Sequence, residues 1–412
     1  ISEEAFMKDV DFVNNLKLRV GWGQTGNSGN MTGRAIAALS GDAAYQFYPA
    51  NGHAGAFGGN RDRYTGWYAG LVDTNLKWET NEMLNFGIDF SFLENWDVTL
   101  EYFIKNTKDL LLTRQIRPTA GYTQIYTNYG EIQNKGFEFT VNYHKQVNKD
   151  FGFNVSLNGS TLSNKVKKMG DPLYSTCSAN GAGTLDGSNV QAVGDANGFL
   201  WGDHSICMEG EAVGSFYGYL TDGIIKNQQE LDAYVKSITF IAEDGTPTYG
   251  DNVGSGASIG DYRFKDINGD NRIDNNDRVI LGNGFPALNY GLTLGATYKD
   301  WDFSMAMNGV FGQEIFSYSA MRLSNMFASD DQTTVNVLKE SYDAAFRNGE
   351  GSLPRLSLLD KNGNRRVSDA YVKDGDFFRI SNLQVGYTLP QTITNKLSIQ
   401  KARVYVGVQN LL

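Results

Sequence analysis

The sequence has little of what marks several common protein classes. Its 412 residues include only 2 cysteines and 7 prolines, too few cysteines for a disulfide scaffold. No window of about 18 apolar residues occurs, which excludes a membrane-spanning helix. Acidic residues outnumber basic ones by 46 to 36, for a net charge of -10, so the basic surface expected of a nucleic-acid-binding protein is missing. No Pro-rich, Ser-rich or highly charged linker divides the chain.

Recognisable catalytic chemistry is also scarce. The three histidines, His53, His144 and His204, are scattered and have no metal-ligand or nucleophile partner at motif spacing. The Gly-rich stretch 58–70 neither follows a clear strand nor precedes a helix, so it does not fit a phosphate-binding loop. Cys177 and Cys207 lie in a Gly/Asn/Ser-rich region, where they either pair in an oxidising compartment or remain free. We therefore expect no enzymatic activity.

Glycine and aromatic residues are abundant instead. The 47 glycines exceed the usual share of about 7%, and aromatics make up 13% of the chain, a composition typical of many strands joined by turns. Apolar and polar residues alternate with period two over several long segments, which predicts strands. These segments are 85–92, 96–106, 134–145, 151–160, 290–298, 301–311, 383–389 and 402–410.

The connections between these strands alternate between tight and long. Short turns join 85–92 to 96–106, 134–145 to 151–160 and 290–298 to 301–311, whereas residues 161–211, 221–289 and 312–376 form long connections. Strands of a soluble sandwich usually run about 5–6 residues. Strands of about 10 residues with one apolar face, short turns on one side and long loops on the other are typical of a transmembrane antiparallel β-barrel. That all-β barrel is the predicted fold; a soluble glycan-binding β-protein is the alternative.

Two of the long connections carry helical signals. Asn227 and Glu230 have the spacing of a capping box, which predicts a helix over 227–235. In 330–349 a second helix is expected to end at Gly349, with one apolar stripe made of Val335, Leu338, Tyr342 and Phe346. We expect both helices to brace loops.

The stretch 266–277 has the oxygen spacing of a calcium-binding loop. Positions 1, 3, 5, 9 and 12 carry oxygen side chains and position 7 offers a carbonyl; in order, these residues are Asp266, Asn268, Asp270, Asp274, Asp277 and Arg272. Asn271 replaces the usual glycine at position 6, and position 12 is Asp instead of Glu. No helices flank the loop, so it is not an EF-hand sensor. The sequence leaves two alternatives: bound calcium, as the only expected cofactor, or a metal-free loop rich in Asx turns.

Two polar aromatic clusters are candidates for ligand contacts. Aromatic faces together with Asn, Asp and Arg on loops or lumen walls would suit a polar ligand such as a glycan or a peptide. The first cluster comprises Arg61, Arg63, Tyr64, Trp67 and Tyr68, and the second comprises Trp201, Asp203 and His204. The alternative is that these side chains only pack loops against one another.

Several motifs resemble the SusC/RagA family of TonB-dependent outer-membrane transporters, in that family's order and over nearly the whole chain. They occupy residues 16–29, 75–111, 134–143, 211–225, 260–294, 372–390 and 402–412. The resemblance implies that residues 1–412 are the C-terminal part of a barrel of roughly 22 strands. The chain opens without Met and stops at "VQNLL", so we expect a fragment that lacks the plug and the N-terminal region.

The family resemblance also implies a function and partners. Such proteins import oligosaccharides or peptides across the outer membrane of Gram-negative bacteria. They work with a SusD-like surface lipoprotein as a lid, and TonB supplies energy through the N-terminal region. Membrane lipid would surround the barrel. A passive porin-like barrel is a further alternative, and the sequence does not distinguish glycan from peptide cargo.

Overall fold

The structure is a computed structural model that describes most of the chain. The described residues are 12–28, 39–45, 64–69, 71–115, 124–169, 173–176, 184–185, 204–248, 255–324, 334–342 and 351–411. No helix among them is long and apolar enough to cross a membrane.

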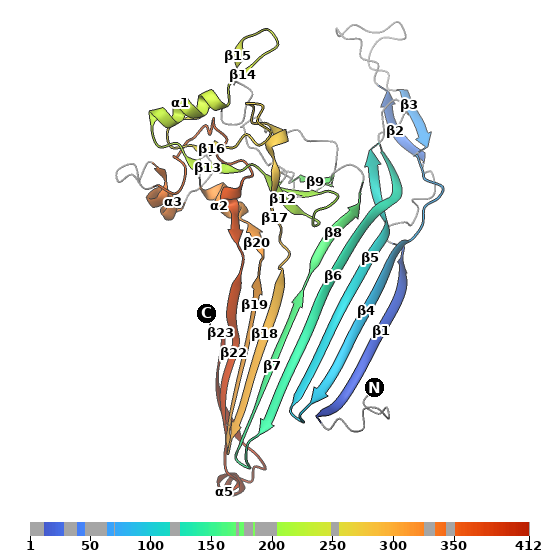
Figure 1. Ribbon diagram of the computed structural model, residues 1–412, viewed down its shortest axis with the longest axis vertical. Coiled ribbons are helices and arrows are strands. Elements are labelled where there is room, and N and C mark those ends of the chain that lie inside the picture. The colour runs from blue at the N-terminus through green and yellow to red at the C-terminus, as the bar shows by residue number, and fades with distance from the viewer. Residues whose placement is uncertain are drawn as a thin grey trace.

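A 10-stranded antiparallel sheet of long, tilted strands dominates the molecule (Figure 1). Its order is β1 (Val13–Asn27), β4 (Glu79–Phe92), β5 (Trp96–Gln115), β6 (Gln124–Gln146), β7 (Phe151–Thr161), β18 (Leu288–Tyr298), β19 (Trp301–Phe311), β22 (Phe377–Thr388) and β23 (Arg403–Leu411). The remaining strand, β8 (Ser163–Lys168), pairs with β6 beyond the end of β7. Since β1 and β23 each have one neighbour among the described strands, the sheet is a curved wall and not a closed barrel.

The predicted strands and tight turns are confirmed. The prediction 301–311 coincides with β19, whereas β5 and β6 continue well past the predicted ends as a longer hairpin. Leu93 and Glu94, between β4 and β5, and Lys299, between β18 and β19, have positive φ, as tight hairpin turns require. The described parts of the long connections lie at the opposite end of the strands (Figure 1).

Alternation gives the sheet one apolar face, called here the outer face, and one polar face, called the inner face. The register aligns apolar side chains across neighbouring strands: Leu18 lies opposite Ile88, Ile88 opposite Leu100, and Leu100 opposite Phe139. Many outer-face side chains stay exposed, up to 74% for Val406. An exposed apolar face of this extent is typical of a surface that meets lipid.

A row of aromatic residues and glycines crosses five strands of the outer face. Phe139 of β6, Gly159 of β7, Tyr290 of β18, Gly309 of β19 and Phe378 of β22 follow one another in register. A Cβ on Gly159 would lie 2.6 Å from the Phe139 ring, and one on Gly309 would lie 2.5 Å from the Tyr290 hydroxyl. The Phe139 and Tyr290 rings thus each cover a neighbouring glycine, an arrangement that stabilises strand glycines.

The described parts of the connections 204–287 and 312–376 fold together above β18, β19 and β22 and are called here the loop module (Figure 1). Its helices are α1 (Gln228–Ser237), α2 (Tyr318–Leu323), α3 (Val335–Glu340), η3 (Asn275–Asp277) and η4 (Asp369–Tyr371). Its strands are β11 (Ser205–Cys207), β12 (Ser215–Gly218), β13 (Thr221–Ile224), β14 (Phe240–Ile241), β15 (Pro247–Thr248), β16 (Tyr262–Phe264), β17 (Val279–Gly282), β20 (Glu314–Phe316) and β21 (Val372–Asp374).

The remaining elements are short. The strands β9 (Leu173–Thr176) and β10 (Thr184–Leu185) extend the β11–β12–β17 sheet. The strands β2 (Leu39–Tyr45) and β3 (Tyr64–Ala69) pair with each other. The helices α5 (Gln391–Thr394) and η5 (Asn395–Leu397) lie between β22 and β23, at the tight-turn end.

The hydrophobic core of the described residues lies in the loop module. It is built from Tyr219, Ile224, Ile225, Tyr234, Ile238, Tyr262, Phe264, Ile273, Met321, Val367 and Tyr371. These residues come from three segments that are distant in the sequence. The loop module therefore has an interior hydrophobic core like that of a water-soluble domain. The wall needs no such core, because lipid covers its apolar face.

Of the two predicted helices, one is confirmed and one is wrong in part. Asn227 caps α1 by accepting a hydrogen bond from the Glu230 N–H at 2.9 Å. The second helix, α3, ends at Glu340. Its predicted stripe is wrong, because Val335 and Leu338 are exposed while Val337 is buried. Phe346 and Gly349 lie outside the described residues.

Candidate functional site

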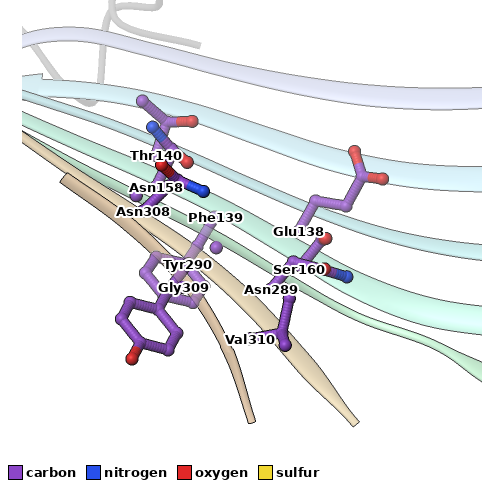
Figure 2. A pocket seen from close by; sticks show the side chains of 12 residues that line it. Glu138, Phe139, Thr140, Asn158, Ser160, Asn289, Tyr290, Asn308, Gly309 and Val310 are labelled. Carbon is purple, nitrogen blue, oxygen red and sulfur yellow. The ribbon is translucent and has the colours of Figure 1, made fainter. Parts of the chain in front are cut away.

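A polar hollow of about 450 Å³ lies on the wall where β6, β7, β18 and β19 run side by side (Figure 2). Two rows of inner-face positions cross it. The first contains Thr140, Asn158, Gly291 and Asn308, and the second contains Glu138, Ser160, Asn289 and Val310. Phe139, Gly159, Tyr290 and Gly309 also line the hollow; alternation assigns their side chains to the outer face.

Six polar side chains line this hollow: Glu138, Thr140, Asn158, Ser160, Asn289 and Asn308. Within the described part of the chain, none of them makes a side-chain hydrogen bond or an ion pair, although neighbouring inner-face groups do. For example, Ser156 donates to Asn142 Oδ1 at 2.6 Å, one row below. The hollow therefore offers unpaired amides, hydroxyls and one carboxylate to whatever occupies the lumen.

The inner face of β1, β4 and β5 is different, because an arginine there is already paired with two carboxylates. Arg19 binds Asp89 at 3.0 Å and Glu101 at 3.2 Å, reaching across Gly87, where a Cβ would lie 2.9 Å from the guanidinium. These pairs leave fewer free groups for a ligand on that face. Lys108 and Glu82, which pair at 2.6 Å, lie instead at outer-face positions of β5 and β4.

A buried polar network holds the loop module together. Asp261 is fully buried; its Oδ1 accepts from Arg355 Nε and from Asn364 Nδ2, both at 2.9 Å. Asn362 donates to the Asn364 side chain at 2.7 Å. Burial raises the pKa of the Asp360 carboxyl, and the nearby negative charge of Asp261 raises it further, although two backbone N–H groups oppose this. The network ties β16 to the segment 355–365, which is a structural role.

The predicted ligand clusters are only partly described. Arg61, Arg63, Trp201 and Asp203 lie outside the described residues. Tyr64, Trp67 and Tyr68 lie on β3. Their role in ligand binding stays a prediction.

His204 is the described member of the second cluster. Its ring stacks on Phe316 with centroids 5.6 Å apart, and burial lowers its pKa, which favours the neutral imidazole. Nearby, Cys207 has a free thiol that accepts a hydrogen bond from the Gly214 N–H at 3.3 Å. Cys177 lies outside the described residues.

The predicted calcium loop is closed by its own hydrogen bonds. Asp266 accepts from the backbone N–H groups of Gly269 and Asn271, both at 2.7 Å. The Asp277 side chain is fully buried and accepts from Ile267 and Asp274, both at 2.8 Å.

The other predicted ligands also face the loop backbone. Asn268 accepts from the Asp270 N–H, and Asp270 accepts from the Arg272 N–H. Asp274 caps η3 through the Asn276 N–H. Among the described residues, no three His, Cys, Asp or Glu side chains converge as a metal site would require. Asx turns account for the loop, although carboxylate oxygens retain lone pairs for a cation; calcium stays a prediction.

The pattern of single strands does not predict the hollow. Its residues belong to four strands, and the alternation of each strand already placed them on the polar face. Only the register, which pairs Asn158 with Thr140 and with Gly291, brings them together.

An antiparallel wall with an apolar outer face, a polar inner face and loops folded at one end defines the class of outer-membrane β-barrel proteins. Residues 9–242 match the family model described as TonB dependent receptor-like, beta-barrel. The chain therefore belongs to this family, and it is a SusC/RagA-type part of the barrel.

Curated relatives and solved structures agree. The chain is 28% identical to TonB-dependent receptor P3 of Formosa agariphila, over 100% of this chain and 36% of the relative. It is 26% identical to TonB-dependent receptor SusC of Bacteroides thetaiotaomicron, over 100% of this chain and 35% of the relative. The structure of the RagAB peptide transporter has a similar fold, with a TM-score of 0.63 and 17% identity over 99% of this chain and 38% of that chain. This chain thus spans little more than a third of the relatives' length, and the curated relatives are named as receptors, not as enzymes.

Proposed function

We propose that residues 1–412 form the C-terminal part of the barrel of a TonB-dependent importer in the outer membrane. The parent protein takes up oligosaccharides or peptides together with a SusD-like surface lipoprotein. The observation that carries the proposal is the asymmetry of the fold, because a folded loop module stands at one end of a wall whose inner face is polar. Family membership supports the direction of transport, since the family is one of TonB-dependent receptors.

In this mechanism, cargo is captured between the lipoprotein and the loop module on the outside of the cell. The buried network around Asp261 keeps that module rigid enough to serve as the lower half of the capture site. A plug and a TonB-binding segment belong to the parent protein outside residues 1–412. TonB pulling on them opens a path along the inner face of the wall.

The experiment is to isolate the full-length parent from outer membranes in mild detergent and to identify what co-purifies with it. A stoichiometric lipoprotein supports the lidded importer. A barrel that purifies alone favours a passive porin-like protein. Absence of the parent from the membrane fraction contradicts the outer-membrane assignment.

We also propose that the loop 266–277 takes up calcium weakly, in the millimolar range typical of extracellular modules. The support is the spacing of Asp266, Asp270 and Asp277 together with the exposed position of Asp270 and the half-buried position of Asp266. The test is calcium titration of the parent and of an Asp266→Ala, Asp270→Ala double variant. Loss of one bound ion in the double variant supports the site. Unchanged stoichiometry leaves the Asx-turn loop as the whole explanation.

A further inference from the structure

Two lysines of β6 flank the apolar band of the outer face. The outer-face positions of this part of β6 are, in order, Lys135, Phe137, Phe139, Val141, Tyr143 and Lys145. Lys135 and Lys145 are ten positions apart, which is about 34 Å along a strand and about 26 Å along the membrane normal for a tilt of about 40°. The apolar band of a membrane barrel is about 25 Å tall. Lys135 therefore lies where acyl chains end and headgroups begin, at the end of the band away from the tight turn that follows Gln146.

The strand β8 places a second lysine beside the first. Ser163 lies opposite Lys135, and Lys165 lies opposite Gln133, so Lys165 is the diagonal neighbour of Lys135. Long side chains at diagonal positions of an antiparallel pair reach one another. Both lysines are exposed.

The neighbours of Lys165 along β8 show which way it points. Asn164 donates to Asn134 Oδ1 at 2.7 Å and accepts from the Val213 N–H of the loop module at 2.8 Å. Val166 is fully buried. Since successive side chains of a strand point to opposite faces, Lys165 points away from the loop module, to the outer face.

Other charges on this part of the outer face are compensated. Lys108 pairs with Glu82 at 2.6 Å, and Lys168 lies opposite Glu131. The two lysines at positions 135 and 165, in contrast, make no ion pair with another described residue. The wall therefore carries an excess of positive charge directly above its apolar band.

A phosphate fits this pair of ammonium groups. Like charges at neighbouring positions of a sheet repel one another, and an anion between them removes that cost. Each lysine is able to donate a charge-assisted hydrogen bond to a phosphate oxygen. Basic residues next to a membrane-spanning segment attract anionic lipid headgroups, and the apolar surface below them is already in contact with lipid.

We propose that Lys135 and Lys165 bind the phosphate of an anionic lipid headgroup, in the membrane leaflet on the side of the loop module. The headgroup bridges β6 and β8. The acyl chains lie along Phe137 and Tyr102, which are opposite each other and exposed on the outer face directly below. This site is on the outside of the barrel, so it goes beyond the import function and depends on neither the cargo nor the lipoprotein.

The test uses the full-length parent in nanodiscs of phosphatidylcholine, with every natural cysteine replaced by serine. Phe137→Cys carries a bimane fluorophore at the position that the acyl chains should touch. A small fraction of the lipid is replaced by phosphatidic acid or by phosphatidylcholine that carries bromine at the same place on its acyl chains. Bromine quenches bimane on contact, so the ratio of the two quenching curves measures which lipid is enriched next to position 137.

We expect phosphatidic acid to be enriched at least about fivefold over phosphatidylcholine, a factor equivalent to about 1 kcal/mol, the contribution of one lysine near an anionic surface. The double variant Lys135→Gln, Lys165→Gln should lose this preference. The matched control is Lys17→Gln with Lys105→Gln, which removes the same charge from inner-face positions of the same wall and should keep the preference.

Four outcomes overturn the site. They are equal quenching by the two brominated lipids, a preference that survives the outer-face double variant, an equal loss in the inner-face control, which would assign the effect to net charge, and no quenching by either lipid, which would mean that lipid does not reach this surface. Loss of the preference in millimolar inorganic phosphate at constant ionic strength would reassign the lysines to a free anion. The readout requires neither transport nor the lipoprotein, so each of these outcomes leaves the importer in place.

Discussion

The wall and the loop module solve the problem of burying apolar groups in opposite ways. In the wall, apolar residues such as Val155 and Leu157 alternate with polar ones along β7 and lie on the surface that lipid covers. In the loop module, apolar residues such as Tyr371 and Ile225 are buried within the protein. The wall depends on the solvent around it, whereas the module carries its own core.

Polar groups follow the same division. The module buries Asp261 and satisfies it with a guanidinium, an amide and a backbone N–H. On the inner face of the wall, the side chains of Asn158 and Asn308 have no hydrogen-bond partner among the described residues. Fully satisfied polar groups fix a structure, and unsatisfied ones are available for binding. The same kind of substitution should therefore have different effects in the two regions.

The largest expected effect is in the module. Asp261→Ala leaves Arg355 without its buried partner, and breaking a buried pair costs about 3–5 kcal/mol. We expect the loop module to become sensitive to limited proteolysis while the barrel stays resistant. Asp222→Ala is the control, because Asp222 is an exposed partner of Arg263 and such pairs contribute about 0–1 kcal/mol. Equal protease sensitivity of the two variants would mean that the network does not hold the module.

A charge on the outer face of the wall should have the next largest effect. Val155 lies opposite Tyr143 and Leu294 in the middle of the apolar band. Val155→Lys should destabilise the folded protein in bilayers by about 2–4 kcal/mol. The control, Asn154→Lys, points to the inner face and should change it by less than about 0.5 kcal/mol. Similar values for both variants would contradict the assignment of the two faces.

A smaller effect is expected where an aromatic ring covers a glycine. Gly159→Ala forces the Phe139 ring to move, because the two groups would approach to 2.6 Å, and such overpacking costs about 1–3 kcal/mol. Gly21→Ala in β1 has open space around its Cβ and should change stability by less than about 0.5 kcal/mol. The measurement is the free energy of unfolding of both variants in bilayers. A Gly159→Ala variant as stable as Gly21→Ala would show that the Phe139 ring moves freely.

The same contrast explains what the sequence can predict. Alternation located the wall strands and their faces, because in each strand every second residue meets lipid. It stopped short of the ends of β5 and β6, since pairs such as Thr113 with Tyr126 lie beyond the apolar band. Periodicity also chose the wrong face of α3, where the short helix turns Val337 and not Leu338 to the core. The hollow and the buried network join residues far apart in the sequence, so only the folded register reveals them.

The smallest expected effect is the pH dependence that Asp360 gives the loop module. Burial raises the pKa of this carboxyl above its ordinary value of 3.8, so the folded module binds the proton more tightly than the unfolded chain. Stability from this group is therefore greatest at low pH and falls as pH rises from 3.8 through the raised value. The Asp360→Asn side chain cannot ionise, so the stability of the module should depend less on pH in this range. The substitution also removes one acceptor for the N–H groups of Asn364 and Arg365. The measurement is the protease sensitivity of the module between pH 3.5 and about 7, compared between the unchanged protein and Asp360→Asn. Asp244→Asn is the control, because the Asp244 carboxyl is exposed and has a lowered pKa. A profile that keeps its slope in the Asp360→Asn variant would assign the titration to another group.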